Sequence, residues 1–236
     1  MNNIKLIYRI IFAIVGITIL AMGVSFMRYA VFGVDPVTCL NIGIAQQMGI
    51  SFGTWQLIMC FILIIGVFIF DRSKIGLGTV YIMVAAGYIS DFFLWLITRI
   101  PFFEVFSLEI RIVAFLIGLF FYYFGAAVYI ETNMGLSPYD AVGIIIAEKI
   151  KRPNWFKWIR IGTDALCVMG GILTGSDVGI GTLISVLLGG PFIALFRKLL
   201  IKIVITHGDR LSADNGCHQE KNKIDLILYP NVRYEK

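Results

Sequence analysis

The chain has 236 residues, of which 58% are hydrophobic and 15% are charged. A soluble domain carries about a quarter charged residues and under half apolar ones, so this composition cannot cover the surface of a soluble globule of this size. It excludes a soluble enzyme, a nucleic-acid-binding module and a disordered protein as first interpretations. The net charge of +5 then needs an explanation other than nucleic acid.

Six stretches are apolar and close to the about 20 residues with which a helix crosses a bilayer. They are residues 7–30, 54–70, 75–98, 111–130, 158–175 and 178–203. Bulky residues rather than a cleavage site follow the first stretch, which indicates an uncleaved membrane helix.

Two further pieces, residues 34–50 and 136–150, are shorter and polar at an end. As helices they would reach only about 22–26 Å, which favours re-entrant or broken half-helices. We therefore predict an all-α polytopic membrane protein with about six transmembrane helices and two short re-entrant helices. The alternative is eight crossing helices.

Lys and Arg gather on the cytoplasmic side of membrane proteins, so their positions predict the orientation. Six crossings from a cytoplasmic N-terminus leave three basic residues outside and put twelve inside. The outer three are Arg28, Arg99 and Arg111, and the inner twelve are Lys5, Arg9, Arg72, Lys74, Lys149, Lys151, Arg152, Lys157, Arg160, Arg197, Lys198 and Lys202. Eight crossings give the same ratio, so the rule predicts cytoplasmic termini in both cases. The short polar pieces favour six crossings.

The two halves of the chain align as an internal repeat, residues 5–100 with residues 107–203. The aligned pairs are Arg9/Arg111, Gly16/Gly118, Gly23/Gly125, Gly33/Gly135, Pro36/Pro138, Trp55/Trp158, Gly76/Gly179, Gly78/Gly181, Thr79/Thr182 and Gly87/Gly190. Three crossings per repeat would invert the second copy, a common transporter plan, whereas four would leave the copies parallel. Residues 1–203 thus form one transmembrane domain. Residues 204–236 are too polar to span and are predicted to be a cytosolic tail, for which disorder is one interpretation.

Each repeat contains a Gly-x-x-Pro element, and both elements have the features of a helix start. Asp35-Pro36 and Ser137-Pro138 put a good N-cap residue before a proline in the first turn, and Asp140 completes a capping-box pattern. Simple helix starting explains these residues. The functional alternative is that two half-helix N-termini offer free N–H groups to a solute.

Three more acidic residues are candidates because ionisable groups inside a bilayer are costly. Asp91 lies within a predicted span without an opposite charge three or four residues away. Asp164 follows Arg160 by one helical turn, which predicts a local ion pair. Glu131 precedes the second Gly-x-x-Pro element, as an entrance residue or a solvated loop residue. No cysteine or histidine spacing indicates a metal, and no motif indicates a cofactor.

The segments FGVDPVT, NMGLSPYDA, KIGLGTV and VGIGTL, together with the duplicated apolar plan, resemble the YczE/YyaS/YitT group of bacterial membrane proteins. The resemblance covers about residues 5–203. It implies an inner-membrane location and supplies neither catalytic residues nor a substrate.

The leading functional hypothesis is a small-solute transporter or permease rather than an enzyme. Its expected partners are the lipid bilayer and a small solute, and an oligomer stays open. Its expected site comprises Asp35, Pro36, Ser137, Pro138, Asp140 and Asp91, with Asp164 and Glu131 as secondary candidates. The alternative is a non-transporting accessory or scaffold protein. Catalysis would need an aspartate pair such as Asp91 with Asp164, because both histidines lie in the tail.

Overall fold

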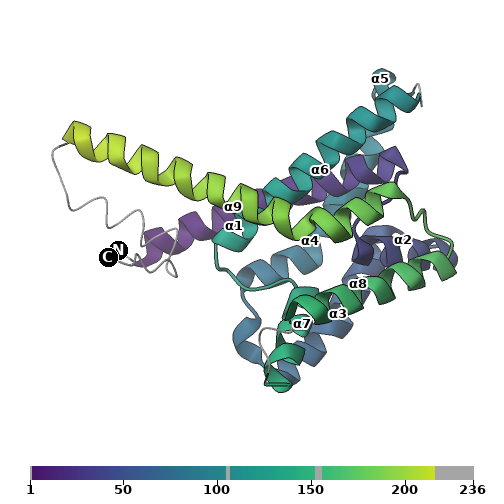
Figure 1. Cartoon of the computed structure of the whole chain (residues 1–236), viewed down its shortest axis with the longest axis horizontal. Coiled ribbons are helices and arrows are strands. Elements are labelled where there is room, and N and C mark those ends of the chain that lie inside the picture. The colour runs from purple at the N-terminus through teal and green to yellow at the C-terminus, as the bar shows by residue number, and fades with distance from the viewer. Residues whose placement is uncertain (1, 105–106, 152–155, 216–236) are drawn as a thin grey trace.

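The computed structural model describes residues 2–104, 107–151 and 156–215, and all regular elements in these ranges are helical (Figure 1). In chain order they are α1 (Asn2–Ala30), α2 (Pro36–Met48), α3 (Phe52–Phe70), the 3₁₀ turn η1 (Arg72–Lys74), α4 (Leu77–Ile97), α5 (Pro101–Glu104), α6 (Leu108–Glu131), α7 (Pro138–Lys149), α8 (Phe156–Leu173) and α9 (Ile180–Asn215). The prediction of an all-α polytopic membrane protein is confirmed.

Among the described residues, five helices are long and apolar enough to cross a membrane: α1, α3, α4, α6 and α9. The sixth expected span corresponds to α8. This helix has only 18 residues and includes Lys157, Arg160 and Asp164, so its composition alone does not mark it as a span.

Helix α9 runs to Asn215, so residues 204–215, the described part of the predicted cytosolic tail, are helical. Residues 216–236 lie outside the described residues.

Helices α1 and α4 run in the same direction. Ser25 Oγ in α1 donates to the carbonyl of Ser90 in α4 (2.9 Å), and Arg28, one turn later, reaches Asp91. Earlier residues of both helices share one buried cluster, which contains Ala13 and Ile17 of α1 and has Tyr81 and Ile82 of α4 packed against it. Between two helices with the same direction the chain must cross the membrane once in the opposite direction, and α3 makes this crossing. The contacts therefore favour six crossings, with α2 adding none.

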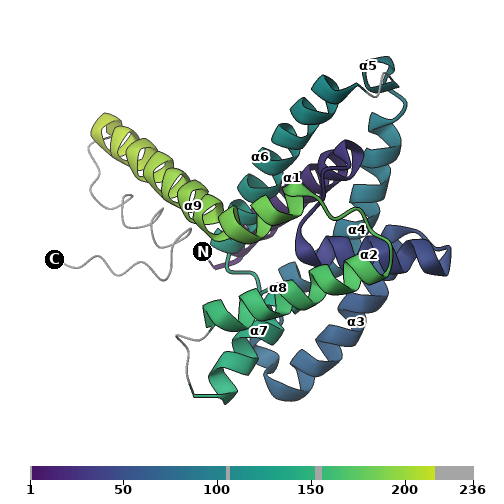
Figure 2. The same ribbon diagram turned by 45° about the vertical axis from the view of Figure 1, so that its right-hand side comes forward.

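Helices α1 and α6 are antiparallel and share the most extensive helix contact of the molecule (Figure 2). Glycines face backbone across this contact at both ends, Gly16 against Gly125 and Gly23 against Gly118. A Cβ atom at Gly16 would lie 2.8 Å from Tyr129 N, and one at Gly23 would lie 2.8 Å from Gly118 O. Small residues allow such close approach of membrane helices.

The loops before α2 and α7 are each held by the helix start of the other half. Gly181 N donates to the carbonyl of Phe32 (2.7 Å), and Gly78 N donates to the carbonyl of Met134 (2.9 Å). Gly33 and Gly135 follow these carbonyls with φ of 101° and 107°, a left-handed conformation that glycine adopts without strain. The G-x-G-T sequences thus serve to bind the opposite loop.

Helices α2 and α7 have 13 and 12 residues, or about 18–20 Å, less than the about 30 Å of a bilayer core. Asp35 caps α2 by accepting from Thr38 N, and Ser137 caps α7 by accepting from Asp140 N, with Pro36 and Pro138 in the first turns. The predicted helix starts are confirmed.

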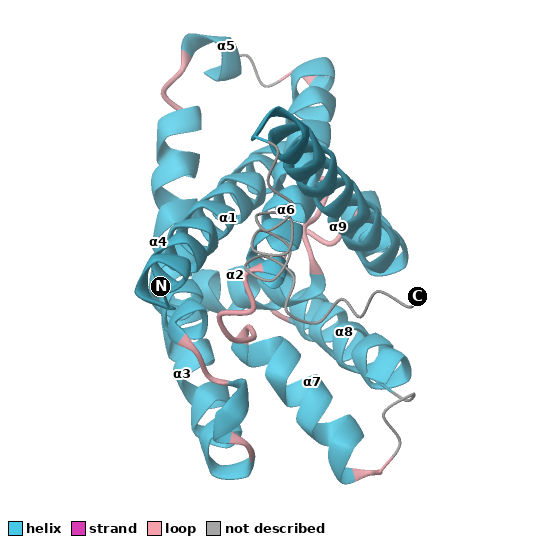
Figure 3. Ribbon diagram, turned by 90° about the vertical axis from the view of Figure 1, so that its left-hand side faces the viewer, coloured by secondary structure: helices cyan, strands magenta, loops and turns pink. Residues whose placement is uncertain are grey.

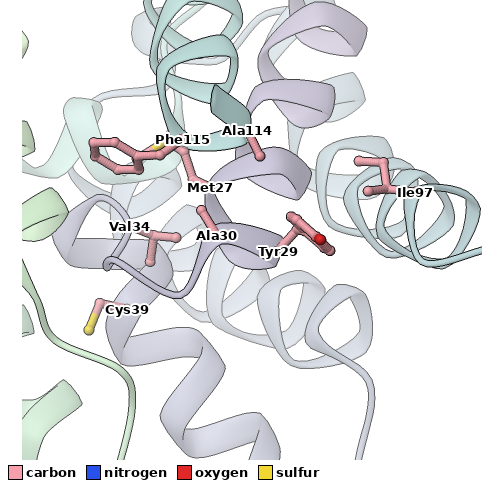
Figure 4. Packing of buried hydrophobic residues seen from close by; sticks show 8 residues of the cluster. All are labelled: Met27, Tyr29, Ala30, Val34, Cys39, Ile97, Ala114 and Phe115. Carbon is pink, nitrogen blue, oxygen red and sulfur yellow. The ribbon is translucent and has the colours of Figure 1, made fainter. Parts of the chain in front are cut away.

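A buried apolar cluster fixes the start of α2 to the ends of its neighbours (Figure 4). It joins Met27 and Ala30 of α1 with Phe115 of α6, and Val34 and Cys39 extend it into α2. The short helix therefore has a defined position relative to the α1–α6 pair.

The halves differ in how their last two helices pack. Helices α3 and α4 are in close contact where Gly53 meets Gly87, whereas Gly190, the counterpart of Gly87, has no atom within 4 Å of a Cβ built on it. Helices α8 and α9 lie apart in Figure 3 and make little contact with each other. The second half is consequently the more open one.

The change Gly23→Ala should lower the melting temperature in detergent, because its Cβ would meet the α6 backbone. Overpacking of this kind costs roughly 1–3 kcal/mol. Gly66→Ala in α3 is the control, since no atom lies within 4 Å of that Cβ. Equal melting temperatures for both variants would contradict the described α1–α6 contact.

The helix directions also predict the sidedness of the loops. In a cysteine-free background, Ser73→Cys and an N-terminal tag should be accessible from the same membrane face, and Ile100→Cys from the opposite face. An impermeant thiol reagent and an antibody measure this. Accessibility of the tag and position 73 from opposite faces would instead mean eight crossings.

Candidate functional site

A group of polar side chains lies where α7 and α8 meet. Tyr139 Oη donates to Asp164 Oδ1 (2.7 Å), and Arg160 pairs with Asp140 and, at 3.4 Å, with Asp164 Oδ2. The guanidinium also lies over the ring of Tyr139, 4.8 Å from its centroid. One cation is therefore held by two carboxylates and an aromatic ring, and the predicted Arg160–Asp164 pair is confirmed as part of this group.

Helix α8 contributes to this group through one face. Arg160, Asp164, Cys167 and Gly171 follow the spacing of four, three and four residues that lines up one side of a helix. Cys167 Sγ lies 4.0 Å from Tyr139 Oη, and Gly171 packs against Cys39 of α2. The polar face of α8 is thus turned towards the two short helices.

The helix starts of α7 and α2 both border this group. Asp140 accepts a hydrogen bond from Ser137 Oγ (2.7 Å) while it pairs with Arg160. Asp35, the N-cap of α2, lies within electrostatic range of Arg160 and Asp164. No ion pair involves Asp35 among the described residues. Two carboxylates therefore contact one guanidinium and a third acts on it from a greater distance, which leaves an excess of negative charge.

The polar group of α8 has no counterpart in the first half. In the alignment that pairs Trp55 with Trp158, the α3 positions matching Arg160, Asp164 and Cys167 are Leu57, Phe61 and Ile64. Helix α3 packs beside α2 and α7 without any charged side chain. Because the same packing role is filled by apolar residues there, the charges of α8 are not needed to build the fold.

The structure brings some of the expected site residues together and separates others. Asp35, Pro36, Ser137, Pro138, Asp140 and Asp164 all lie at or beside the polar group. Asp91 is elsewhere: it pairs with Arg28 (2.8 Å) and accepts from Gly53 N (2.7 Å). The expectation that it lacks an opposite charge holds only along its own helix, since the partner comes from α1.

Glu131 also lies apart from the polar group. It pairs with Arg197 of α9 and its side chain is 14% exposed. It therefore links the end of α6 to α9.

A cleft with a volume of ≈ 150 Å³ lies beside the first Gly-x-x-Pro element. Gly33 and Val34 form part of its wall, and Arg28, Gln46 and Asp177 line it. The cleft borders the first Gly-x-x-Pro element, and no residue of the second element lines it.

Comparison with known proteins gives relatives that match most of the chain. The uncharacterized protein YyaS of Bacillus subtilis is 30% identical over 189 residues, which is 79% of this chain and 90% of the relative. The uncharacterized membrane protein YczE of Bacillus subtilis is 26% identical over 188 residues, 79% of this chain and 84% of the relative. An uncharacterized protein of Haemophilus influenzae is 27% identical over 203 residues, covering 84% and 86%.

No solved structure matches the chain. The model of the family of unknown function DUF6198 matches residues 7–198, which includes all the helices of the polar group, and the resemblance stated from the sequence motifs is confirmed by YyaS and YczE. The chain belongs to the DUF6198 family of unknown function.

Proposed function

We propose that this protein is a permease for a small solute, with its binding site at the polar group formed by Tyr139, Asp140, Arg160 and Asp164. The observation that carries the proposal is a charged group at the junction of two half-helix starts, whose α8 members Arg160 and Asp164 have apolar counterparts in the other half. Ionisable groups kept within a membrane domain without a packing role point to function.

The proposed mechanism rests on two inverted repeats. Gly16 and Gly118 are aligned in sequence, as are Gly23 and Gly125, and the contacts pair Gly16 with Gly125 and Gly23 with Gly118. Each glycine of α1 thus contacts the counterpart of the other α1 glycine. A two-fold axis perpendicular to two antiparallel helices produces this pattern. Transporters with inverted repeats bind their solutes at the repeat interface, where broken helices begin.

The charge of the site favours a solute with a positively charged group. Arg160 is the cation that pairs with the carboxylates of Asp140 and Asp164. The carboxylate of Asp35 adds further negative charge. An amine or guanidinium on a solute would compete with Arg160 for the same oxygens, with the Tyr139 ring offering a cation–π contact. Release of Arg160 from one carboxylate would accompany binding.

We infer that the chain is not an enzyme. The two aspartates considered for catalysis are hydrogen-bonded to different groups. Asp91 binds Arg28 and Gly53. Asp164 instead binds Tyr139 and Arg160. We also propose an inner-membrane location with cytoplasmic termini, which the distribution of Lys and Arg supports.

Uptake into proteoliposomes tests the transport proposal, with radiolabelled methylammonium and guanidinium as probes. The wild-type protein should take up at least one of them, and Asp140→Asn or Asp164→Asn should reduce uptake at least tenfold. Asp71→Asn is the matched control, because Asp71 caps the η1 turn outside the spans. If neither cation enters above the rate of empty liposomes, the proposed solute class is wrong and an accessory role gains support.

Cys167 offers a second test, because it is a free thiol beside Tyr139. In a protein with Cys167 as its sole cysteine, a small cationic methanethiosulfonate should react at least tenfold faster than an anionic one of similar size. The negative charge of the site gives this direction. A protein with Cys60 alone serves as control, since its neighbours in α3 are apolar. Equal rates for the two reagents at Cys167 would contradict a negatively charged, water-accessible site.

A further inference from the structure

Three buried hydroxyl groups of α6 and α9 form no hydrogen bond of normal geometry with the described residues, although those of Tyr123 and Ser185 face each other. They belong to Tyr123, Thr182 and Ser185, whose residues are 2%, 2% and 7% exposed. A buried hydroxyl without a partner costs about 1–3 kcal/mol, and most buried side-chain polar atoms in proteins have one. Three such groups at one place indicate that something else binds there.

The three residues are brought together by the packing of α9. Thr182 and Ser185 are three residues apart and therefore lie on the same face of the helix. Tyr123 stacks on Phe192 of α9 with ring centroids 5.3 Å apart, and its hydroxyl oxygen would lie 3.5 Å from a Cβ built at Gly189. This places the Tyr123 hydroxyl beside the face that carries Ser185.

The loop that leads to Asp35 adjoins the same hydroxyls. A Cβ built at Gly33 would collide with Thr182 Oγ1, and the charge of Asp35 acts on Tyr123. Because Asp35 has no ion-pair partner in the described part of the chain, and Arg160 acts on it only from a distance, the group combines hydroxyl oxygens with a carboxylate that lacks a direct counter-ion.

The first half shows that the fold does not require these hydroxyls. The positions that match Tyr123 and Ser185 in the alignment are Ala21 and Ile82. Thr79, the counterpart of Thr182, is satisfied because it donates to the carbonyl of Leu136 at 2.7 Å. The second half therefore lacks this hydrogen bond and has two more hydroxyls at the same place.

We propose that Tyr123, Thr182 and Ser185, together with Asp35, form a binding site for a sodium ion. A water molecule could satisfy the hydroxyls but would leave the carboxylate charge uncompensated, which is costly inside a membrane protein. A single carboxylate with neutral oxygens suits a monovalent cation, whereas calcium and magnesium are usually bound through more carboxylates or water. Broken-helix transporters bind coupling cations near such helix ends.

Coupling of this ion to solute movement rests on the proposed permease function, but binding of the ion does not. The full-length protein in detergent is therefore tested without any solute. Its melting temperature is followed by tryptophan fluorescence while NaCl replaces choline chloride at constant ionic strength. Sodium should raise the melting temperature in a saturable manner, as expected for a ligand that binds the folded state, and potassium should have a smaller effect.

Two conservative variants locate the site. Tyr123→Phe and Ser185→Ala should each remove most of the sodium-dependent shift, and their sodium-free melting temperature should be unchanged or higher because an unsatisfied hydroxyl is gone. Ser25→Ala is the matched control: this buried hydroxyl is satisfied by the carbonyls of Ala21 and Ser90, so its loss should lower stability and leave the sodium shift intact.

Three results would overturn the proposal. Equal melting temperatures in sodium chloride and choline chloride would mean that water, and not sodium, binds the three hydroxyls. A sodium shift that survives in the Tyr123→Phe/Ser185→Ala double variant places the ion elsewhere. A sodium shift also lost in Ser25→Ala shows only a general effect on stability. Failure of cation uptake in proteoliposomes leaves the sodium shift as it is, so the failures of the two proposals are distinguishable.

Discussion

The structure depends on the need to satisfy backbone hydrogen bonds where the chain leaves its helices inside a membrane domain. The loops before α2 and α7 meet this need by accepting amide protons from the first turns of α9 and α4, through the carbonyls of Phe32 and Met134. Non-helical backbone is tolerated at membrane depth only when protein covers it in this way. Each half thus completes the other, and the antiparallel glycine contact of α1 with α6 brings them close enough to do so.

Much of this arrangement follows from the sequence because it is recorded in local patterns. Apolar stretches predict the long helices, and Asp35-Pro36 and Ser137-Pro138 predict the starts of α2 and α7. The distribution of basic residues does not decide the number of crossings, since it is the same for six and for eight. The short polar pieces favour six, and tertiary contacts such as the parallel course of α1 and α4 support that prediction.

The candidate site can be predicted only in part, because local patterns reveal single residues and not their contacts with other helices. Asp140 and Asp164 were identified from their positions near a helix start and within a span, but the partnership with Tyr139 joins different helices. The pairing of Asp91 with Arg28 could not be predicted either, because the two residues lie 63 positions apart in the chain. The partnerless hydroxyls of α6 and α9 give no sequence signal at all, because Ser, Thr and Tyr are ordinary residues in membrane helices.

The composition of α8 has a consequence for how the protein enters the membrane. A segment with Lys157, Arg160 and Asp164 among 18 residues partitions poorly into lipid when it is alone, because each charge costs about 2.5–3.5 kcal/mol near the centre of a helix. Its pairing with Asp140 and Tyr139 of the preceding helix offsets part of this cost. Helices α7 and α8 are therefore best inserted as a unit, after the first half has provided the surface on which they assemble.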